Sequence, residues 1–168
     1  MRIVFLDLDG VLATLATRYD YFEPRCLRLL KELVEETDAH IVITSAWRKR
    51  HYLESMRKVF ELDGDEDLLL YGVKRYEGPR MGFPIKRIIG LTPFSTREMK
   101  DGVPFGRGHE ISMWLERAKG KTDIESYVVL DDEKADIAPH VDRLVQSNSY
   151  LGLTHTEIDE AKRILMGS

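Results

Sequence analysis

The stretch VFLDLDGVL, which runs from Val4 to Leu12, is the part of the sequence from which the rest is best interpreted. It is an apolar run typical of a buried strand, and it ends in two aspartates, Asp7 and Asp9, followed directly by Gly10. Burial of a charge costs free energy, so two carboxylates at the end of a core strand require an explanation. A lone Asp-x-Asp pattern is weak evidence of a site, because aspartates commonly end strands as turn formers. The surrounding sequence therefore has to show whether this pair has a function.

Outward from this stretch, the sequence alternates between predicted strands and predicted helices. Strands are predicted over residues 2–8, 40–44, 88–91, 126–130 and 143–146. Helices are predicted over residues 24–37, 49–62, 108–118 and from 154 onward. This alternation predicts an α/β fold of three layers, in which a doubly wound, mostly parallel sheet carries helices on both faces. Ligands of such sheets bind beyond the carboxyl ends of the strands, where the strand order reverses.

The length of 168 residues favours a single domain, expected over residues 1–166, with an insert or flap at about 63–106. This segment holds seven of the twelve glycines and four of the six prolines, and it is long for a connection in a compact domain. It is also basic, since residues 74–107 contain eight Lys and Arg against three acids. The segment is therefore either a guide for a polyanionic substrate or a solvated loop face.

Composition excludes several classes of protein. No apolar run approaches the 18 residues or so that a membrane-spanning helix needs, and no secretory signal is recognisable. The single cysteine, Cys26, excludes an intramolecular disulfide framework and any site with several cysteine ligands. We expect a cytoplasmic protein that makes no membrane contact, and no protein partner is predicted.

Acidic and hydroxyl side chains follow three of the predicted strands. They are Asp7 and Asp9 after the first strand, Thr44 and Ser45 after the second, and Asp131, Asp132 and Asp136 after the fourth. If these strands are neighbours, the carboxylates converge, and two like charges about 4 Å apart repel by roughly 4 kcal/mol at an effective dielectric near 20. Such a cluster needs either protonation or a bound cation. Because all the ligands are oxygens, the favoured ion is a hard one such as Mg²⁺.

The motifs themselves resemble those of a known family. "FLDLDGVL" is similar to the first motif of the haloacid dehalogenase-like (HAD) superfamily of phosphohydrolases, "IVITS" to the second and "YVVLDDEKAD" to the fourth. Arg107, in "GRGHEISMWL", lies 24 residues before Asp131, where the third motif supplies a Lys or Arg. The resemblance covers residues 2–146 in the right order and implies a HAD-like, Rossmannoid fold. The wording "TSAWR" and "RGHEISMWL" further resembles small HAD domains of phage and bacteria, some of them linked with RNA repair.

The resemblance implies a catalytic role for four residues. Asp7 would be the nucleophile that forms an aspartyl-phosphate, and Asp9 the general acid that later acts as the base. Alternation along a strand places side chains i and i+2 on the same side, so both aspartates could reach one phosphate. Thr44 would bond a phosphate oxygen, and Arg107 would neutralise charge on the phosphoryl group. Rival candidates for this cation are Lys86, Arg87, Arg97 and Lys100.

The resemblance also implies a Mg²⁺ site built from the same strand ends. Its ligands would be Asp7, the backbone carbonyl of Asp9, and Asp132. Asp131 and Asp136 would join the site through water or through the ligands that they contact. Mg²⁺ usually keeps several waters, which leaves room for a phosphate oxygen.

The loop after the second motif offers candidates for substrate binding. Ser45, Trp47 and Arg48 follow Thr44 directly. Trp47 is a candidate for stacking on a base and Arg48 for binding a distal phosphate. The alternative is that Trp47 anchors the core and that Arg48 pairs with a surface acid. Gly10, which would let the backbone turn tightly beneath the site, completes this predicted set.

The size of the substrate follows from the absence of a cap. HAD enzymes that act on small metabolites often carry a large cap, but only 13 residues separate Gly10 from the first predicted helix, and the segment at 63–106 is too short for a full cap domain. We therefore predict a Mg²⁺-dependent phosphomonoesterase that acts on a nucleotide or a polynucleotide phosphate end. The alternatives are a phosphatase of a small metabolite or phosphoprotein, and a non-catalytic phospho-accepting signalling domain such as a receiver.

Overall fold

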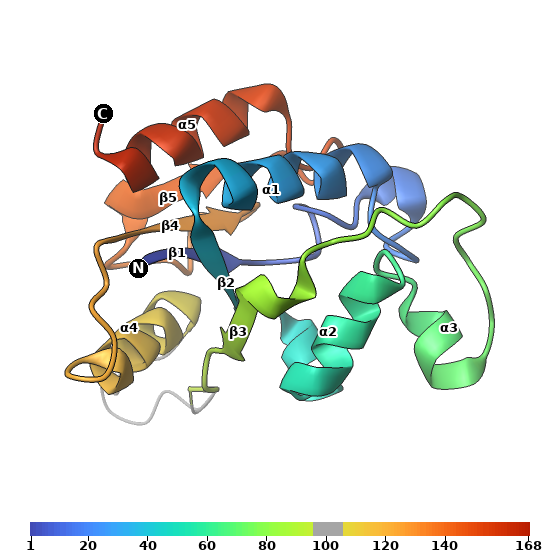
Figure 1. Ribbon diagram of the computed structural model, residues 1–168, viewed down its shortest axis with the longest axis horizontal. Coiled ribbons are helices and arrows are strands. Elements are labelled where there is room, and N and C mark those ends of the chain that lie inside the picture. The colour runs from blue at the N-terminus through green and yellow to red at the C-terminus, as the bar shows by residue number, and fades with distance from the viewer. Residues whose placement is uncertain (96–105) are drawn as a thin grey trace.

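The computed structural model describes residues 1–95 and 106–168, which form a five-stranded sheet (Figure 1). The strands are β1 (Arg2–Leu6), β2 (Ala39–Ile43), β3 (Ile88–Leu91), β4 (Ser126–Asp131) and β5 (Leu144–Gln146). Their order is β3-β2-β1-β4-β5, and every neighbouring pair is parallel. The chain builds one side of β1 first and returns to build the other side with β4 and β5. The predicted doubly wound α/β fold is confirmed.

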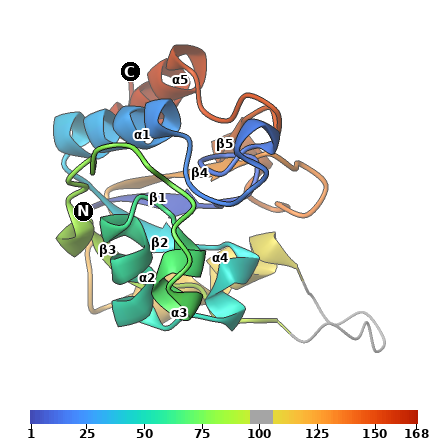
Figure 2. The same cartoon turned by 90° about the vertical axis from the view of Figure 1, so that its right-hand side faces the viewer.

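Helices cover both faces of this sheet and complete three layers (Figure 1, Figure 2). They are α1 (Pro24–Thr37), α2 (Leu53–Glu61), α3 (Glu66–Tyr71), α4 (Arg107–Ala118) and α5 (His155–Met166). The helices α1, α2 and α5 supply buried residues to the core cluster on one face of the sheet, and α4 supplies Ile111 to the cluster on the other face. The short helix α3 packs beside α2. In the part of the chain that the structure describes, no helix has the length and apolar character needed to cross a membrane.

Burial on both faces explains why β1 is apolar at every position after Arg2. Val4 and Leu6 belong to the core cluster that α1, α2 and α5 cover, whereas Ile3 and Phe5 belong to the cluster on the α4 side. Successive side chains of a strand point to opposite faces, so a strand covered on both sides needs a continuous apolar run. The ring of Phe5 meets that of Trp114, from α4, edge-on with the ring centroids 5.5 Å apart.

Several element boundaries differ from the predictions. β1 ends at Leu6 instead of residue 8. The helix predicted over 49–62 begins later in the structure: a 3-10 turn at Ala46–Lys49 comes first, and α2 starts only at Leu53. No periodic pattern predicts α3, since it has six residues and none of them is buried. The carboxylate of Asp65 stabilises its first turn by accepting a hydrogen bond from the backbone N–H of Leu68 at 3.2 Å.

Within the predicted insert, residues 63–95 supply α3, a loop and the edge strand β3. Buried carboxylates hold the loop by its backbone: Asp65 accepts hydrogen bonds from the N–H groups of Arg75 and Tyr76 at 2.7 and 2.9 Å, and Asp63 accepts one from Met81 at 3.1 Å. These bonds attach the loop firmly to the domain. The prediction of a flap concerns also residues 96–105, which lie outside the described residues.

The basic residues of this segment mostly contact acids. Ion pairs join Lys74 to Glu77, Arg75 to Asp67, Arg80 to Asp63 and Arg87 to Asp38, with N–O distances of 2.9–3.6 Å. Cations that are paired in this way attract a polyanion less, so the described part of the segment favours the solvated-loop interpretation over a guide for substrate. Arg97 and Lys100 lie outside the described residues.

Candidate active site

The candidate site lies at the carboxyl ends of three neighbouring strands. In the parallel register, Leu6 of β1 is paired with Ile43 of β2 on one side and with Leu130 of β4 on the other. The residues that follow these three positions therefore come together at one edge of the sheet. They are Asp7 after β1, Thr44 after β2, and Asp131 and Asp132 at the end of β4.

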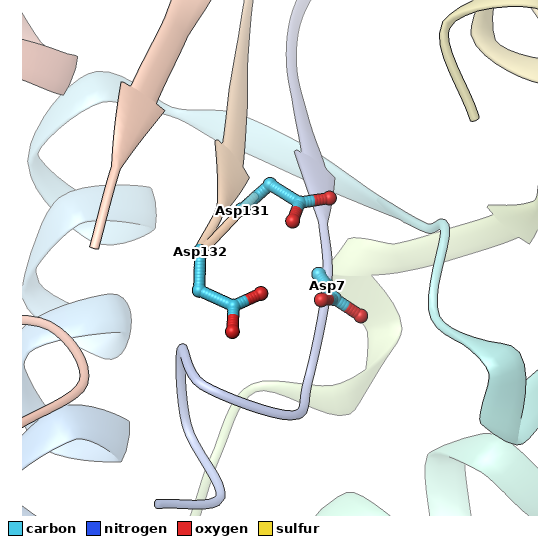
Figure 3. A group of neighbouring side chains, drawn as sticks. All are labelled: Asp7, Asp131 and Asp132. Carbon is cyan, nitrogen blue, oxygen red and sulfur yellow. The ribbon is translucent and has the colours of Figure 1, made fainter. Parts of the chain in front are cut away.

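Three of the carboxylates form one cluster (Figure 3). Asp7, Asp131 and Asp132 each offer an oxygen atom, and these atoms all lie within 4.8 Å of one another. Asp7 is only 5% exposed, and burial raises the pKa of its carboxyl to about 8; Arg107 opposes this rise, whereas the charge of Asp131 adds to it. Burial likewise raises the pKa of Asp131. A buried cluster of like charges is stable only if some of the carboxyls are protonated or a cation compensates their charge.

Arg107 supplies one positive charge to this cluster. Its Nη1 atom lies 2.6 Å from Oδ2 of Asp131 and 3.1 Å from Oδ2 of Asp7. Burial acts to lower the pKa of Arg107, but Asp7 and Asp131 together raise it above its ordinary value, so the guanidinium stays charged. Arg107 is the first residue of α4, and its backbone N–H donates to Oδ2 of Asp136 at 3.1 Å. Asp136, which was predicted to join the site indirectly, thus contacts the backbone of Arg107.

The rival cations lie elsewhere or outside the described residues. Lys86 and Arg87 immediately precede β3, so they lie at the opposite edge of the parallel sheet from the cluster. Arg87 pairs there with Asp38, which precedes β2. Arg97 and Lys100 belong to the segment that the structure does not describe.

Asp9 faces the same small pocket as Asp7, although neither residue lies within β1. The pocket has a volume of about 200 Å³, and its lining includes both aspartates together with Arg107 and Asp132. The indole Nε1 of Trp47 donates a hydrogen bond to Oδ1 of Asp9 at 3.1 Å. Burial raises the pKa of Asp9, and this hydrogen bond opposes the rise. Trp47 therefore holds the Asp9 carboxylate in place and partly offsets the rise of its pKa.

Of the two roles considered for Trp47, its surroundings favour the core anchor over the stacking platform for a base. The side chain is 5% exposed, and its ring packs against Phe22 with the centroids 5.8 Å apart. Its aromatic faces are therefore unavailable to a ligand. Ser45 is likewise buried, and its hydroxyl accepts a hydrogen bond from the N–H of Trp47 at 3.2 Å. Ser45 therefore caps the 3-10 turn, which differs from its expected role in substrate binding.

Arg48 also differs from the expected role. Its guanidinium donates to Oε2 of Glu110 at 2.9 Å and to the carbonyl oxygens of Thr92 and Pro93 at 2.8 and 3.1 Å. Glu110 uses its other oxygen to accept a hydrogen bond from the N–H of Ser95 at 2.9 Å. A cation so fully paired is not free to bind a distal phosphate. Nothing in the sequence marks Glu110 as its partner, because an acid in the first turn of a helix is ordinary.

Gly10 was predicted to belong to the substrate-binding set, but in the structure its lack of a side chain makes room for Asp132. Its backbone has φ +79°, and a Cβ atom at this position would lie 2.2 Å from Oδ2 of Asp132. The carbonyl of Gly10 accepts a hydrogen bond from the hydroxyl of Ser147 at 2.7 Å, and Oδ2 of Asp132 accepts one from Ser149 at 2.8 Å. Both serines follow β5, and the sequence predictions did not include them, since isolated serines after a strand are ordinary loop residues.

Thr44 carries a polar atom that needs a partner. Its side chain is fully buried, and its hydroxyl oxygen has no hydrogen-bond partner among the residues that the structure describes. A buried hydroxyl without a partner costs about 1–3 kcal/mol. A phosphate oxygen held beside Asp7 could supply this missing bond.

The residues present fit a hard divalent cation. Both oxygens of Asp131 are occupied, one by Arg107 and the other by the N–H of Glu133 at 2.9 Å. Asp7 and Asp132 therefore remain as the side chains best able to hold Mg²⁺ directly. The all-oxygen ligand set and the excess of negative charge suit this ion.

Comparison with known proteins agrees with the motifs. A family model described as "HAD domain in Swiss Army Knife RNA repair proteins" matches residues 3–158, which is nearly the whole chain. No curated protein and no solved structure matches the sequence. The resemblance inferred from the motifs is thereby confirmed, and with it a function of the phosphohydrolase type. The chain belongs to the family of HAD domains found in Swiss Army Knife RNA repair proteins.

Proposed function

We propose that the chain is a Mg²⁺-dependent phosphomonoesterase that removes the phosphate from a nucleic-acid or nucleotide end. The observation that carries the proposal is the shared pocket of Asp7 and Asp9, which also holds Arg107 and Asp132. A nucleophile, a proton donor and a cation are the groups that hydrolysis of a phosphoester through a covalent intermediate requires. The family supports phosphohydrolase chemistry in general, and these residues support the particular mechanism.

The reaction would take place in two steps. In the first, an oxygen of the Asp7 carboxylate attacks phosphorus, the bond to the leaving oxygen breaks, and Asp9 donates its proton to that oxygen. In the second, Asp9 removes a proton from a water molecule, which attacks the phosphorus of the aspartyl-phosphate. Phosphate leaves, and the Asp7 carboxylate and the proton on Asp9 are restored.

The charges around Asp7 explain why a cation is needed for the first step. The carboxyl must be ionised to attack, yet burial raises its pKa to about 8. Arg107, 3.1 Å away, favours the ionised form and would also stabilise the negative phosphoryl oxygens. Mg²⁺, held by Asp7 and Asp132, would supply further positive charge to the phosphoryl group. Thr44 would donate its unpaired hydroxyl to a phosphate oxygen.

The proposed substrate is a bulky molecule with a terminal phosphate. The pocket of about 200 Å³ is below the range of about 300–1,000 Å³ that is usual for small-ligand sites, so it suits the phosphoryl group and little more. The segment between Gly10 and α1 contains only a short 3-10 turn at Leu15–Thr17, with no cap domain inserted. The link of the family to RNA repair favours an RNA end.

The test is phosphate release by the wild type and by Asp7→Asn in the presence of Mg²⁺. The substrates are 3′- and 5′-phosphorylated oligoribonucleotides, free nucleotides and sugar phosphates. We expect turnover of the nucleic-acid or nucleotide substrates, and a loss of roughly a thousandfold or more in kcat for Asp7→Asn. The matched control is Asp142→Asn, which changes an aspartate whose side chain is 80% exposed and should leave turnover unchanged.

Three results would contradict the proposal. Retention of most activity by Asp7→Asn would exclude Asp7 as the nucleophile. A clear preference for sugar phosphates would overturn the proposed substrate. Release of a single phosphate per chain in excess substrate would indicate a phospho-accepting signalling domain instead of an enzyme.

A further inference from the structure

A second cavity adjoins the phosphate pocket. Its volume is about 320 Å³, and the residues that line it include Lys49 and Phe94. It shares Ala46 and Arg107 with the pocket that Asp7 and Asp9 face, so the two spaces meet along these residues. The second cavity falls within the range of about 300–1,000 Å³ in which proteins hold small organic groups. A ligand whose phosphate occupies the first pocket could therefore extend into the second.

An aromatic ring borders this cavity, and the guanidinium of Arg48 packs on it. Phe94 is 47% exposed, which is unusual for a phenyl ring next to a polar site. The guanidinium carbon of Arg48 lies 4.2 Å from the ring centroid, and Arg48 itself is buried and bonded to Glu110 and Thr92. The network that removes Arg48 from substrate binding thus holds the Phe94 ring. A rigid, partly exposed aromatic ring is the group that proteins use to stack unpaired bases.

The charges around the cavity admit a phosphorylated ligand. Three cationic side chains, from Arg48, Lys49 and Arg107, line it together with two acidic ones, from Glu110 and Asp136. The Glu110 carboxylate is already neutralised by Arg48 at 2.9 Å. The exposed Lys49 is therefore positioned to attract an anionic ligand.

We propose that this second cavity binds the base of the nucleotide that carries the reacting phosphate, with the base stacked on Phe94. The proposal rests on the function proposed above and specifies its substrate class. A base-binding site beside the phosphate pocket would let the domain select a nucleotide end over other phosphoesters, although residues 1–95 and 106–168 include no cap domain to enclose a substrate.

The test measures binding, so that it does not depend on turnover. Isothermal titration in the presence of Mg²⁺ would compare adenosine 3′-monophosphate, adenosine 5′-monophosphate and ribose 5-phosphate on the Asp7→Asn chain. We expect at least one nucleotide to bind about tenfold more tightly than ribose 5-phosphate, as stacking of one base implies. Adding Phe94→Leu should bring the two Kd values together, because leucine keeps apolar bulk but lacks an aromatic face. Adding Phe94→Tyr should preserve the ratio.

The matched control is Tyr71→Ala, which removes an aromatic side chain that is 73% exposed at the end of α3 and should leave the ratio unchanged. Equal Kd values for nucleotides and ribose 5-phosphate would overturn the inference, as would a preference that survives Phe94→Leu. Binding of O-phosphotyrosine as tight as that of the nucleotide would point to a phosphoprotein and would also overturn it. Failure of the wild type to release phosphate would instead contradict the proposed function, whatever the Kd values.

Discussion

Gly10 shows how a single residue controls the approach of a carboxylate to the site. A side chain at this position would collide with Asp132, which directly follows β4, the strand next to β1. Gly72, at the end of α3, has a similar backbone conformation with φ +68°, but nothing lies within 4 Å of its missing Cβ. Comparing alanine substitutions at the two glycines therefore separates two free-energy costs, that of the left-handed backbone and that of the collision with Asp132.

The first prediction uses this pair. Gly10→Ala and Gly72→Ala should each cost about 1–2 kcal/mol from the left-handed backbone. Gly10→Ala should in addition displace Asp132 and reduce the rise in Tm that we expect from Mg²⁺ bound at the proposed site, whereas Gly72→Ala should keep this rise in full. Thermal unfolding with and without Mg²⁺ measures both effects. An unchanged Mg²⁺ response in Gly10→Ala would show that the position of Asp132 does not depend on Gly10.

Single residues also show what sequence reasoning can and cannot reach. The structure brings Asp7, Thr44 and Asp132 to one edge because each follows a strand, and position after a strand is visible in the sequence. The orientation of Trp47 and Arg48 depends on partners far along the chain. Asp9 and Glu110, which hold them, are 38 and 62 residues away, and no local pattern announces such a contact.

Between elements, the ion pair of Arg48 with Glu110 connects the turn after β2 to α4. Both side chains are nearly inaccessible, at 4% and 9% exposure. The turn follows Thr44 and carries Trp47, and α4 begins with Arg107. The pair therefore fixes the distance between two elements that carry residues of the site.

The second prediction is that Glu110→Ala lowers the free energy of unfolding by roughly 3–5 kcal/mol, because it leaves the buried Arg48 without its anion. Glu125→Ala is the matched control: it breaks the pair with Arg2, in which Glu125 is 57% exposed, and should cost no more than about 1 kcal/mol. Urea unfolding measures both variants. Similar losses of unfolding free energy in the two variants would mean that the buried ion pair stabilises the fold no more than the exposed one.

The helices and strands that bury more apolar side chains are easier to predict from the sequence, because their burial leaves a periodic pattern. The helix at Pro24–Thr37 buries seven of its residues, and the helical spacing of its leucines predicts it. The helix at Glu66–Tyr71 buries none and depends on the contact of Asp65 with a backbone N–H, which periodicity does not reveal. The α/β fold could be predicted because its central strands also bury apolar side chains, as the helix at Pro24–Thr37 does.

For the whole molecule, the raised pKa of Asp7 makes the free energy of unfolding depend on pH. The pKa of Asp7 in the folded state is about 8, above its ordinary value of 3.8, so between these values the folded state keeps a proton that the unfolded state has released. The stability contributed by this carboxyl is therefore lost as the pH rises from about 4 to about 8.

The third prediction follows from this loss of stability with rising pH. In EDTA, Asp7→Asn should gain stability relative to the wild type as the pH rises from about 5 to about 8, since asparagine carries no charge to bury. Urea unfolding across this pH range measures the difference, which we expect to reach about 2 kcal/mol or more. Saturating Mg²⁺ should reduce the difference by stabilising the ionised wild type. A difference that stays constant with pH would contradict the raised pKa of Asp7.

The central place of β1 has a consequence for the newly synthesised chain. β1 finds one neighbour early, in β2, but its other neighbour, β4, begins only at Ser126. Until Ser126 leaves the ribosome, β1 presents an unpaired apolar edge, which is the kind of surface that seeds aggregation. Docking of β4 covers this edge and delivers Asp131 and Asp132 to Asp7 in the same event. The second side of β1 and the carboxylate cluster are therefore completed together, late in synthesis.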